Sequence, residues 1–227
     1  MMKRKVRSAA KLLSLFLFVM ILSVMFGNVT FAVGADEIET EDEAAYVGSV
    51  SIRNEATGEI FEIPMTQMEQ NVQLSAYHDD GTVTETYEAI IAISKDGTAS
   101  YVDRVPPITR SESTGSDSNT YWKASITITY SVNASTASLT KVSGYWSQLR
   151  GNTTLSNRKV YYAINAGTSG YSDTKTPASN TFSYNTGFGT VSSSRLYAIG
   201  ANSSATITTE AGLQLSITAN VEKRYTN

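Results

Sequence analysis

The sequence predicts an all-β protein built on an antiparallel β-sandwich, immunoglobulin-like in its general architecture. The first observation is a strict alternation of apolar and polar residues from Trp122 to Asn133. The second is the return of this alternation between Leu213 and Glu222. A period of two indicates a strand with one buried and one solvent-facing side. The third observation is that no segment of useful length shows a convincing helical period.

Further β-prone runs lie between these two strands. They are separated by Gly, Asn and Ser turns and occupy residues 138–148, 159–166, 181–185, 196–201 and 205–210. Short strands at this spacing are typical of a β-sandwich. The sequence therefore predicts a sandwich domain over residues 120–227.

Residues 46–103 are predicted to form a small acidic β-meander region. Asp-Gly pairs at 80–81 and 96–97 supply the positive φ angles that tight hairpin turns require. We therefore expect strands at residues 71–78, 83–94 and 98–103. Residues 104–119 contain adjacent prolines and a run of Ser, Thr, Gly and Asp, which predicts a linker or long loop between the two regions.

The N-terminal segment predicts export. Residues 12–26 form a largely apolar run. The residues before this run include five basic side chains and no acidic ones. This layout is typical of a cleavable signal peptide, here residues 1–35, cut after Ala32 or Ala35. The run is shorter than the roughly 20 residues of a spanning helix, although retention as an anchor stays an alternative. We expect a secreted protein, extracellular or associated with the cell surface, that meets the membrane only through this segment.

Charge is divided unevenly along the chain. Residues 36–45 begin with six carboxylates in eight positions, which predicts a disordered acidic leader. Residues 36–117 carry 18 acidic and 4 basic side chains, whereas residues 118–227 carry 3 acidic and 9 basic ones. Two interpretations stay open: the halves neutralise one another in one folded body, or the acidic half belongs to a precursor and is removed.

The side chains that catalysis commonly uses are scarce. The chain has no cysteine, which excludes disulfides, thiol catalysis and lipid attachment to cysteine, and fits an exporting bacterium without an oxidative folding compartment. Its one histidine, His78, falls in a predicted hairpin turn. Glu85 and Glu88 face opposite ways in one strand, so a glycosidase pair would need a carboxylate from another strand. We expect no enzyme activity, no cofactor and no metal site.

Aromatic and basic side chains gather in the second half. Nine of the thirteen tyrosines and both tryptophans follow residue 118. Adjacent residues of a strand face opposite ways, so each of the pairs Tyr145-Trp146 and Tyr161-Tyr162 is expected to turn one ring outward. Alternatively, these rings merely suit strands and half-bury without any ligand. The predicted ligand-binding residues are Tyr145, Trp146, Arg150, Arg158, Lys159 and Tyr161.

These residue types indicate a cell-wall polysaccharide or an anionic polymer as partner, because rings stack on sugars and cations attract anions. Nucleic acid is not expected, given export and a modest basic excess. The leading hypothesis is a secreted, non-catalytic binding or cell-surface interaction module. The alternative is a secreted precursor whose acidic half is cleaved away near residues 104–119 to release a basic, β-rich bacteriocin or pore-forming toxin.

Overall fold

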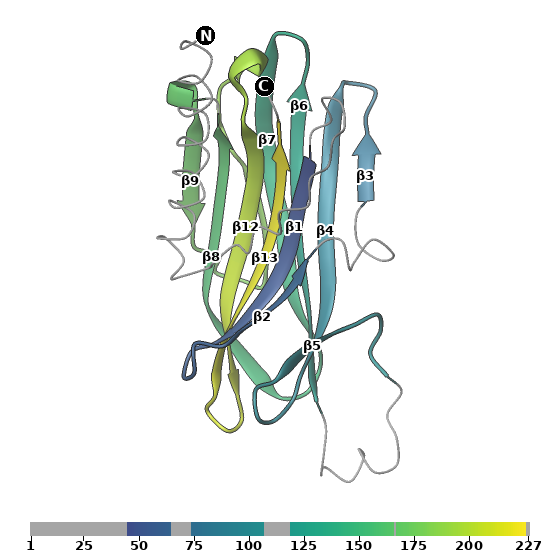
Figure 1. Ribbon diagram of the computed structural model, residues 1–227, viewed down its shortest axis with the longest axis vertical. Coiled ribbons are helices and arrows are strands. Elements are labelled where there is room, and N and C mark those ends of the chain that lie inside the picture. Colours follow the sequence, from purple (N-terminus) through teal and green to yellow (C-terminus); the bar gives the residue numbers. More distant parts are fainter. Residues whose placement is uncertain (1–44, 65–73, 107–118, 166, 226–227) are drawn as a thin grey trace, which may run out of the picture. The chain divides into compact units, whose positions relative to one another are not determined.

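A computed structural model of the chain describes residues 45–64, 74–106, 119–165 and 167–225 (Figure 1). Within these ranges the fold is all-β, and all strand pairs of its two sheets are antiparallel. The predicted signal peptide, both cleavage positions and the acidic leader up to residue 44 lie outside the described residues. So does the greater part of the loop predicted at 104–119.

The first sheet, sheet A, has six strands. Their order across the sheet is β2 (Ile60–Pro64), β1 (Ala45–Asn54), β13 (Gln214–Arg224), β12 (Ala198–Thr209), β8 (Thr153–Asn165) and β9 (Tyr171–Lys175). The 3-10 turn η3 (Gly167–Ser169) lies between β8 and β9 in the chain.

The second sheet, sheet B, has seven strands. Its main order is β10 (Thr181–Asn185), β7 (Thr136–Arg150), β6 (Thr120–Val132), β4 (Thr82–Ile93) and β3 (Leu74–Tyr77). Two short strands complete it: β11 (Val191–Ser192) also pairs with β7, and β5 (Ala99–Val102) also pairs with β4. The 3-10 turn η4 (Ser193–Arg195) follows β11.

The two sheets pack face to face around one apolar core, which confirms the predicted sandwich. Strand β8 faces β7 at one side of the sandwich and β2 faces β5 at the other. Burial of apolar side chains is the main favourable term in such a fold, and it must suffice here without disulfides. The largest core side chains come from both sheets and include Ile91, Trp122, Ile126, Leu139, Trp146, Tyr162, Ile207 and Ile217.

Strand β6 shows most directly how the sequence pattern becomes structure. The apolar series from Trp122 through Tyr130 is buried in the core, and Lys123, Thr127 and Thr129 on the other side are only half-buried. On that outer side, hydroxyls of neighbouring strands meet, as Thr127 Oγ1 lies 2.9 Å from Thr86 Oγ1. The predicted period of two is therefore confirmed in this strand.

Both sheets contain strands from either side of the predicted division at residues 104–119. Strand β1 pairs along its whole length with β13, and β4 pairs along its whole length with β6. The β-meander region and the sandwich domain are thus interleaved and share one core, whereas the sequence suggested two neighbouring units. Local turn signals cannot reveal this, because β13, one of the two partners of β1, lies more than 160 residues away in the chain.

Two local expectations need correction. The predicted meander strands β3 and β5 do not flank β4 on both sides; they share one edge of it, and β6 occupies the other. The runs at 196–201 and 205–210 form a single strand, β12, because the polar residues between them stay paired with β13. Strands β9 and β11 were not predicted.

Candidate binding site on the aromatic flank

The six predicted ligand-binding residues do not form one surface. Tyr145 lies on the outer face of sheet B, where its hydroxyl donates to Glu88 Oε2, and Lys123 Nζ pairs with Glu88 Oε1. Burial and the Glu88 carboxylate raise the pKa of Tyr145. Trp146, on the opposite face of the same strand, is only 1% exposed and belongs to the core. The Trp146 ring is therefore closed to a ligand, whereas the Tyr145 ring is partly exposed with its hydroxyl already engaged.

Arg150 stands at the end of β7, away from the other predicted residues. Its Nη2 donates to the carbonyl oxygen of Pro106, and its guanidinium lies 5.0 Å from the centre of the Tyr121 ring. A cation over an aromatic face is attracted by the ring's electrons. Arg150 thus fastens β6, β7 and the segment after β5 to one another.

Arg158 is positioned by a bulge in β8. The register between β8 and β12 shifts by one residue, and Asn157 takes a left-handed conformation with φ of 50°. The extra residue turns both Leu155 and Val160 toward the core. Arg158 then reaches across the side of the sandwich, where Nε donates to Asn180 Oδ1 at 2.9 Å and Nη2 to the Leu155 carbonyl at 2.9 Å.

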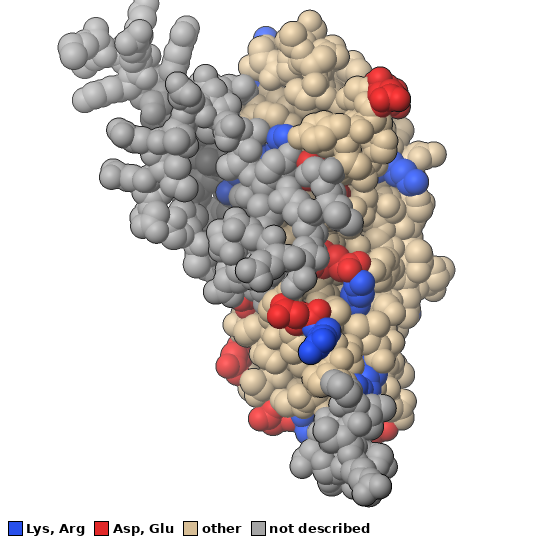
Figure 2. Space-filling model, turned by 90° about the vertical axis from the view of Figure 1, so that its right-hand side faces the viewer, with Lys and Arg blue, Asp and Glu red and all other residues tan. Residues whose placement is uncertain are grey.

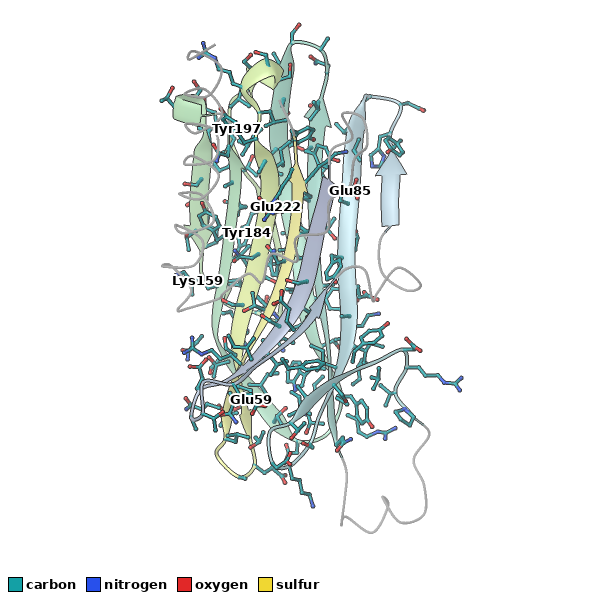
Figure 3. The ribbon with its side chains drawn as sticks, viewed as in Figure 1. Glu59, Glu85, Lys159, Tyr184, Tyr197 and Glu222 are labelled. Atoms are coloured by element: carbon teal, nitrogen blue, oxygen red, sulfur yellow. The ribbon has the colours of Figure 1, made fainter. Side chains whose placement is uncertain are left out.

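Tyr161 points away from the core but is nearly buried. It is 7% exposed, whereas Tyr162 beside it is a member of the core cluster. Burial raises the pKa of Tyr161, and a hydrogen bond with Ser172 acts in the opposite direction. Lys159, two residues earlier, is half-buried and lies on the β9 side of the molecule (Figure 3). The pair turns one ring, that of Tyr161, away from the core as expected, but this ring is nearly covered by its neighbours.

The structure instead brings a different set of rings together at the side where β8 and β9 face β7 and β10. We call this set the aromatic flank: Trp146, Tyr162, Tyr171, Phe182, Tyr184 and Phe188. Trp146 lies 5.2 Å from Phe182 between ring centres, and Phe182 stacks on Tyr184 at 6.0 Å. Tyr162 and Tyr171 each lie 5.5 Å from Phe188. The rings therefore join sheet A to sheet B.

Gly144 of β7 leaves the space that the Phe182 ring occupies. Phe182 pairs directly with this residue across the strands, and a Cβ added at Gly144 would lie 2.7 Å from the Phe182 ring and 2.3 Å from the Ser125 carbonyl oxygen. A ring that packs over a strand glycine covers backbone that would otherwise be poorly packed. The glycine within Ser143-Gly144-Tyr145 thus favours an aromatic residue at the paired position of the neighbouring strand.

The outer part of the flank is open to solvent. Tyr171 is 42% exposed and stacks on Phe188 with an angle of 22° between the ring planes. Tyr184 and Phe188 are half-buried, whereas Trp146 and Tyr162 are buried behind them. The flank therefore presents exposed ring surface on a rigid base, because the inner rings are locked in the core.

Charged and amide groups surround these rings. Asp173 Oδ2 accepts from the Tyr162 hydroxyl at 3.2 Å and pairs with Lys175 Nζ at 2.7 Å. The Lys175 ammonium and the Thr174 backbone N–H lower the pKa of Asp173, so it is ionised at neutral pH. Burial, followed by the Asp173 carboxylate and then Tyr184, raises the pKa of Tyr162 to about 12. The Tyr162 phenol is therefore neutral and donates its proton.

Of the six predicted ligand-binding residues, Trp146 belongs to the aromatic flank and Arg158 lies beside it. Tyr171 and Tyr184 were in the aromatic set without being selected, and Phe182 and Phe188 were overlooked. Phe182 lies in the run predicted as a strand at residues 181–185, and Phe188 lies between two glycines just after it. The available signal was aromatic density: this segment contains three rings within seven residues, Phe182, Tyr184 and Phe188.

The carboxylates are dispersed. Glu85 and Glu88 lie on opposite faces of β4, as expected: Glu85 is 1% exposed and accepts from the Tyr130 hydroxyl at 3.2 Å, on the β4 side of Figure 3. Glu222 is paired with Arg224 at 3.0 Å. His78 Nε2 lies 3.0 Å from Thr84 Oγ1 on the surface. Among the described residues, no group of three or more His, Asp or Glu side chains could hold a metal ion.

Helices contribute little to the described ranges. No helix within the described ranges has the length and apolar character needed to cross a membrane. Comparison of the chain with protein-family models, with curated proteins and with solved structures finds no match.

Proposed function

We propose that this protein is a secreted, non-catalytic β-sandwich, immunoglobulin-like in general architecture, whose aromatic flank binds a cell-surface polysaccharide. The observation that supports the proposal is the exposed Tyr171 ring stacked on the half-buried Phe188 ring, which packs in turn on the core ring of Tyr162. An exposed apolar patch in an otherwise polar surface commonly marks an interaction site. Ring faces supply contact area for sugar C–H groups, and nearby polar side chains fix orientation.

The polar neighbours suit a sugar chain. Asp173 can accept hydrogen bonds from hydroxyls, and Lys175 and Arg158 can donate to hydroxyls or to acidic substituents. Asn180, held by Arg158, adds an amide beside the rings. This mixture of one acid, two bases and an amide favours a neutral or anionic polysaccharide over a cationic polymer.

Binding is favoured over hydrolysis by the arrangement of carboxylates at the flank. Glycosidases ordinarily use two carboxyl groups, about 5–10 Å apart, on either side of the bond they cleave. Asp173 is the carboxylate that the structure places among the flank rings, and Lys175 and Tyr162 already engage it. A binding role requires no second carboxylate.

The shared sheets also favour one functional body over a precursor. Removing everything before residues 104–119 would leave β13 without β1 and β6 without β4, each exposed along a full strand. Long unpaired edges promote aggregation. In culture supernatant, mass spectrometry should therefore find one species beginning near Val33 or Asp36, and a fragment beginning near Arg104 or Arg110 would contradict this.

Pull-down on purified bacterial cell wall tests the binding role. The protein should sediment with the wall, and Tyr171→Ala should weaken sedimentation about tenfold, because it removes the exposed face of the stack. Tyr77→Ala is the matched control, since Tyr77 is 79% exposed on β3 at the other flank. Absence of binding at low salt, or equal loss in both variants, would overturn the proposal.

A further inference from the structure

The outer edge of β9 is open to a further strand. Strand β9 is the last strand of sheet A, so β8 pairs with one of its edges and no other described strand pairs with the opposite one. A strand that is paired on one side presents backbone N–H and C=O groups on the other, and these groups can pair with another chain. Tyr171, Ser172 and Thr174 are exposed, and Figure 1 shows β9 at one side of the molecule.

Two opposite charges stand two residues apart on this strand. Asp173 and Lys175 project from the same side of β9, because successive residues alternate, and Lys175 Nζ lies 2.7 Å from Asp173 Oδ2. The Lys175 side chain is 43% exposed and that of Asp173 is 37% exposed. A carboxylate has about four acceptor sites and an ammonium has three donors, so the bonds within the chain exhaust neither group.

The residue order in β9 is self-complementary for antiparallel pairing. When two copies pair about Thr174, residue 173 of one copy stands opposite residue 175 of the other, and residue 172 stands opposite residue 176. Asp173 then meets Lys175 twice, and Ser172 meets Thr176 twice. Opposite charges and hydroxyl pairs both stabilise cross-strand neighbours, whose Cβ atoms lie about 4.5–5.5 Å apart.

The same charges select the register of the pairing. Moving its centre by one residue sets Asp173 against Asp173 or Lys175 against Lys175, and like charges directly opposite one another are destabilising. Pro177 follows Thr176 and has no backbone N–H, so the ladder ends there. One register is therefore favoured over its neighbours.

The other sheet edges that the structure describes lack this complementarity. Strand β2, at the far edge of sheet A, carries Glu62 as its one charged residue and ends at Pro64. Pairing about Glu62 would oppose two carboxylates, and proline is a common device that blocks an edge. Strands β3, β5, β10 and β11, along the edges of sheet B, contain no charged residue.

We propose that two copies of this chain pair antiparallel along β9 and so join their A sheets into one continuous sheet. The pairing is centred on Thr174, and Asp173 of each copy faces Lys175 of the other. A contact made by one short strand from each copy is smaller than the roughly 1,200–2,000 Å² of a stable interface. We therefore expect a reversible equilibrium between monomer and dimer.

The pairing would also bring two aromatic flanks together. A two-fold axis perpendicular to the joined sheet keeps the inner faces of both copies on one side, and Tyr171 begins β9 in each copy. Two linked sites bind a repeating polymer more tightly than one, because the second contact forms within the same complex. This consequence rests on the proposed function, whereas the pairing itself does not.

Sedimentation equilibrium of the secreted chain tests the pairing without any polysaccharide. Between about 10 μM and 1 mM protein, the average mass should rise from that of one chain toward that of two. Salt at about 1 M should shift the equilibrium toward the monomer, because it screens charges beyond about 3 Å. A chain that stays monomeric throughout this range would overturn the proposal.

A charge exchange assigns the contact to β9. Asp173→Lys and Lys175→Asp each set like charges opposite one another, so each variant alone should dimerise at least tenfold more weakly. An equal mixture should form a dimer with one chain of each variant, seen by native mass spectrometry, because each variant supplies the charge that the other lacks. Dimers that persist in both variants alone, or the absence of a mixed dimer, would overturn the proposal.

Matched controls separate this proposal from wall binding. Glu59→Lys and Lys141→Asp change charge at exposed positions away from β9 and should leave the equilibrium unchanged. Tyr171→Ala removes the ring proposed to bind polysaccharide but keeps Asp173 and Lys175, so it should still dimerise. A monomeric chain that sediments with cell wall would therefore refute the dimer alone.

Discussion

The two flanks lie at opposite sides of the sandwich but carry different side chains. At the aromatic flank, rings of β7 and β10 pack on one another, and rings of β8 and β9 pack on Phe188 in the segment after β10. At the other flank, where β2 faces β5, acidic and basic side chains are interspersed over the lower part of the visible face (Figure 2), and Tyr77 stands 79% exposed. The proposed binding surface is therefore at the first flank, where Phe188 supports the exposed Tyr171 ring.

The largest expected difference between the flanks concerns stability. Trp146→Ala removes a ring that packs on Phe182 in the core, and it should lower the free energy of unfolding by about 3–5 kcal/mol. Tyr77→Ala should change it by less than about 0.5 kcal/mol. Urea denaturation followed by far-UV circular dichroism measures both.

A third variant separates packing from hydrogen bonding at this position. Trp146 Nε1 has no hydrogen-bond acceptor among the described residues. Trp146→Phe should therefore be much milder than Trp146→Ala, because it retains an aromatic ring and loses no bond. A loss as large as that of Trp146→Ala would contradict the expectation that any aromatic ring at this position retains most of the stability.

A smaller effect is expected from Arg158. Its guanidinium links β8 to Asn180 beside β10, so Arg158→Ala should lower the free energy of unfolding by about 1–2 kcal/mol. Lys141→Ala, an exposed change on the outer face of sheet B, should alter it little. Equal effects in the two variants would mean that Arg158 does not hold the aromatic flank closed.

The alkaline stability of the protein should report on Tyr162. An unfolded tyrosine titrates near pH 10, and the fold raises the pKa of Tyr162 to about 12. The fold favours the neutral phenol, so this contribution is complete below pH 10 and is lost as the pH rises through 12. Tyr162→Phe cannot ionise, and its unfolding midpoint should fall less between pH 10 and 12 than that of the parent.

The exposed ring of the other flank provides the control for this titration. Tyr77→Phe should follow the parent across the same pH range, because Tyr77 is exposed. If Tyr77→Phe gained as much alkaline stability as Tyr162→Phe, the effect would not belong to the aromatic flank.

Periodicity predicted a large part of the fold. The alternation in β6 and β13 identified both strands and their buried faces, because one buried side forces a period of two. The pairing of β1 with β13 was not predictable, since many strands of suitable pattern compete for a distant partner. The charge division, which suggested separate units, describes composition and not topology.

The candidate site was predicted only in outline. Counting aromatic residues located the second half, and strand alternation predicted that each adjacent pair divides between the two faces without saying which ring is buried; in the structure Trp146 and Tyr162 are the buried ones. The bulge at Asn157, which re-aims Arg158, breaks the alternation that the prediction assumed. The stack of Tyr171 on Phe188 joins a strand to a loop, and no local sequence rule specifies such a contact.

Mapping the contact of a soluble cell-wall polysaccharide fragment by NMR tests the central claim most directly. The aromatic signals of Tyr171, Tyr184 and Phe188 should shift in a saturable manner, while those of Tyr77 on the other flank stay in place. Shifts centred on Tyr77, or no saturable shift in any of the three flank rings, would contradict the assignment of binding to the aromatic flank.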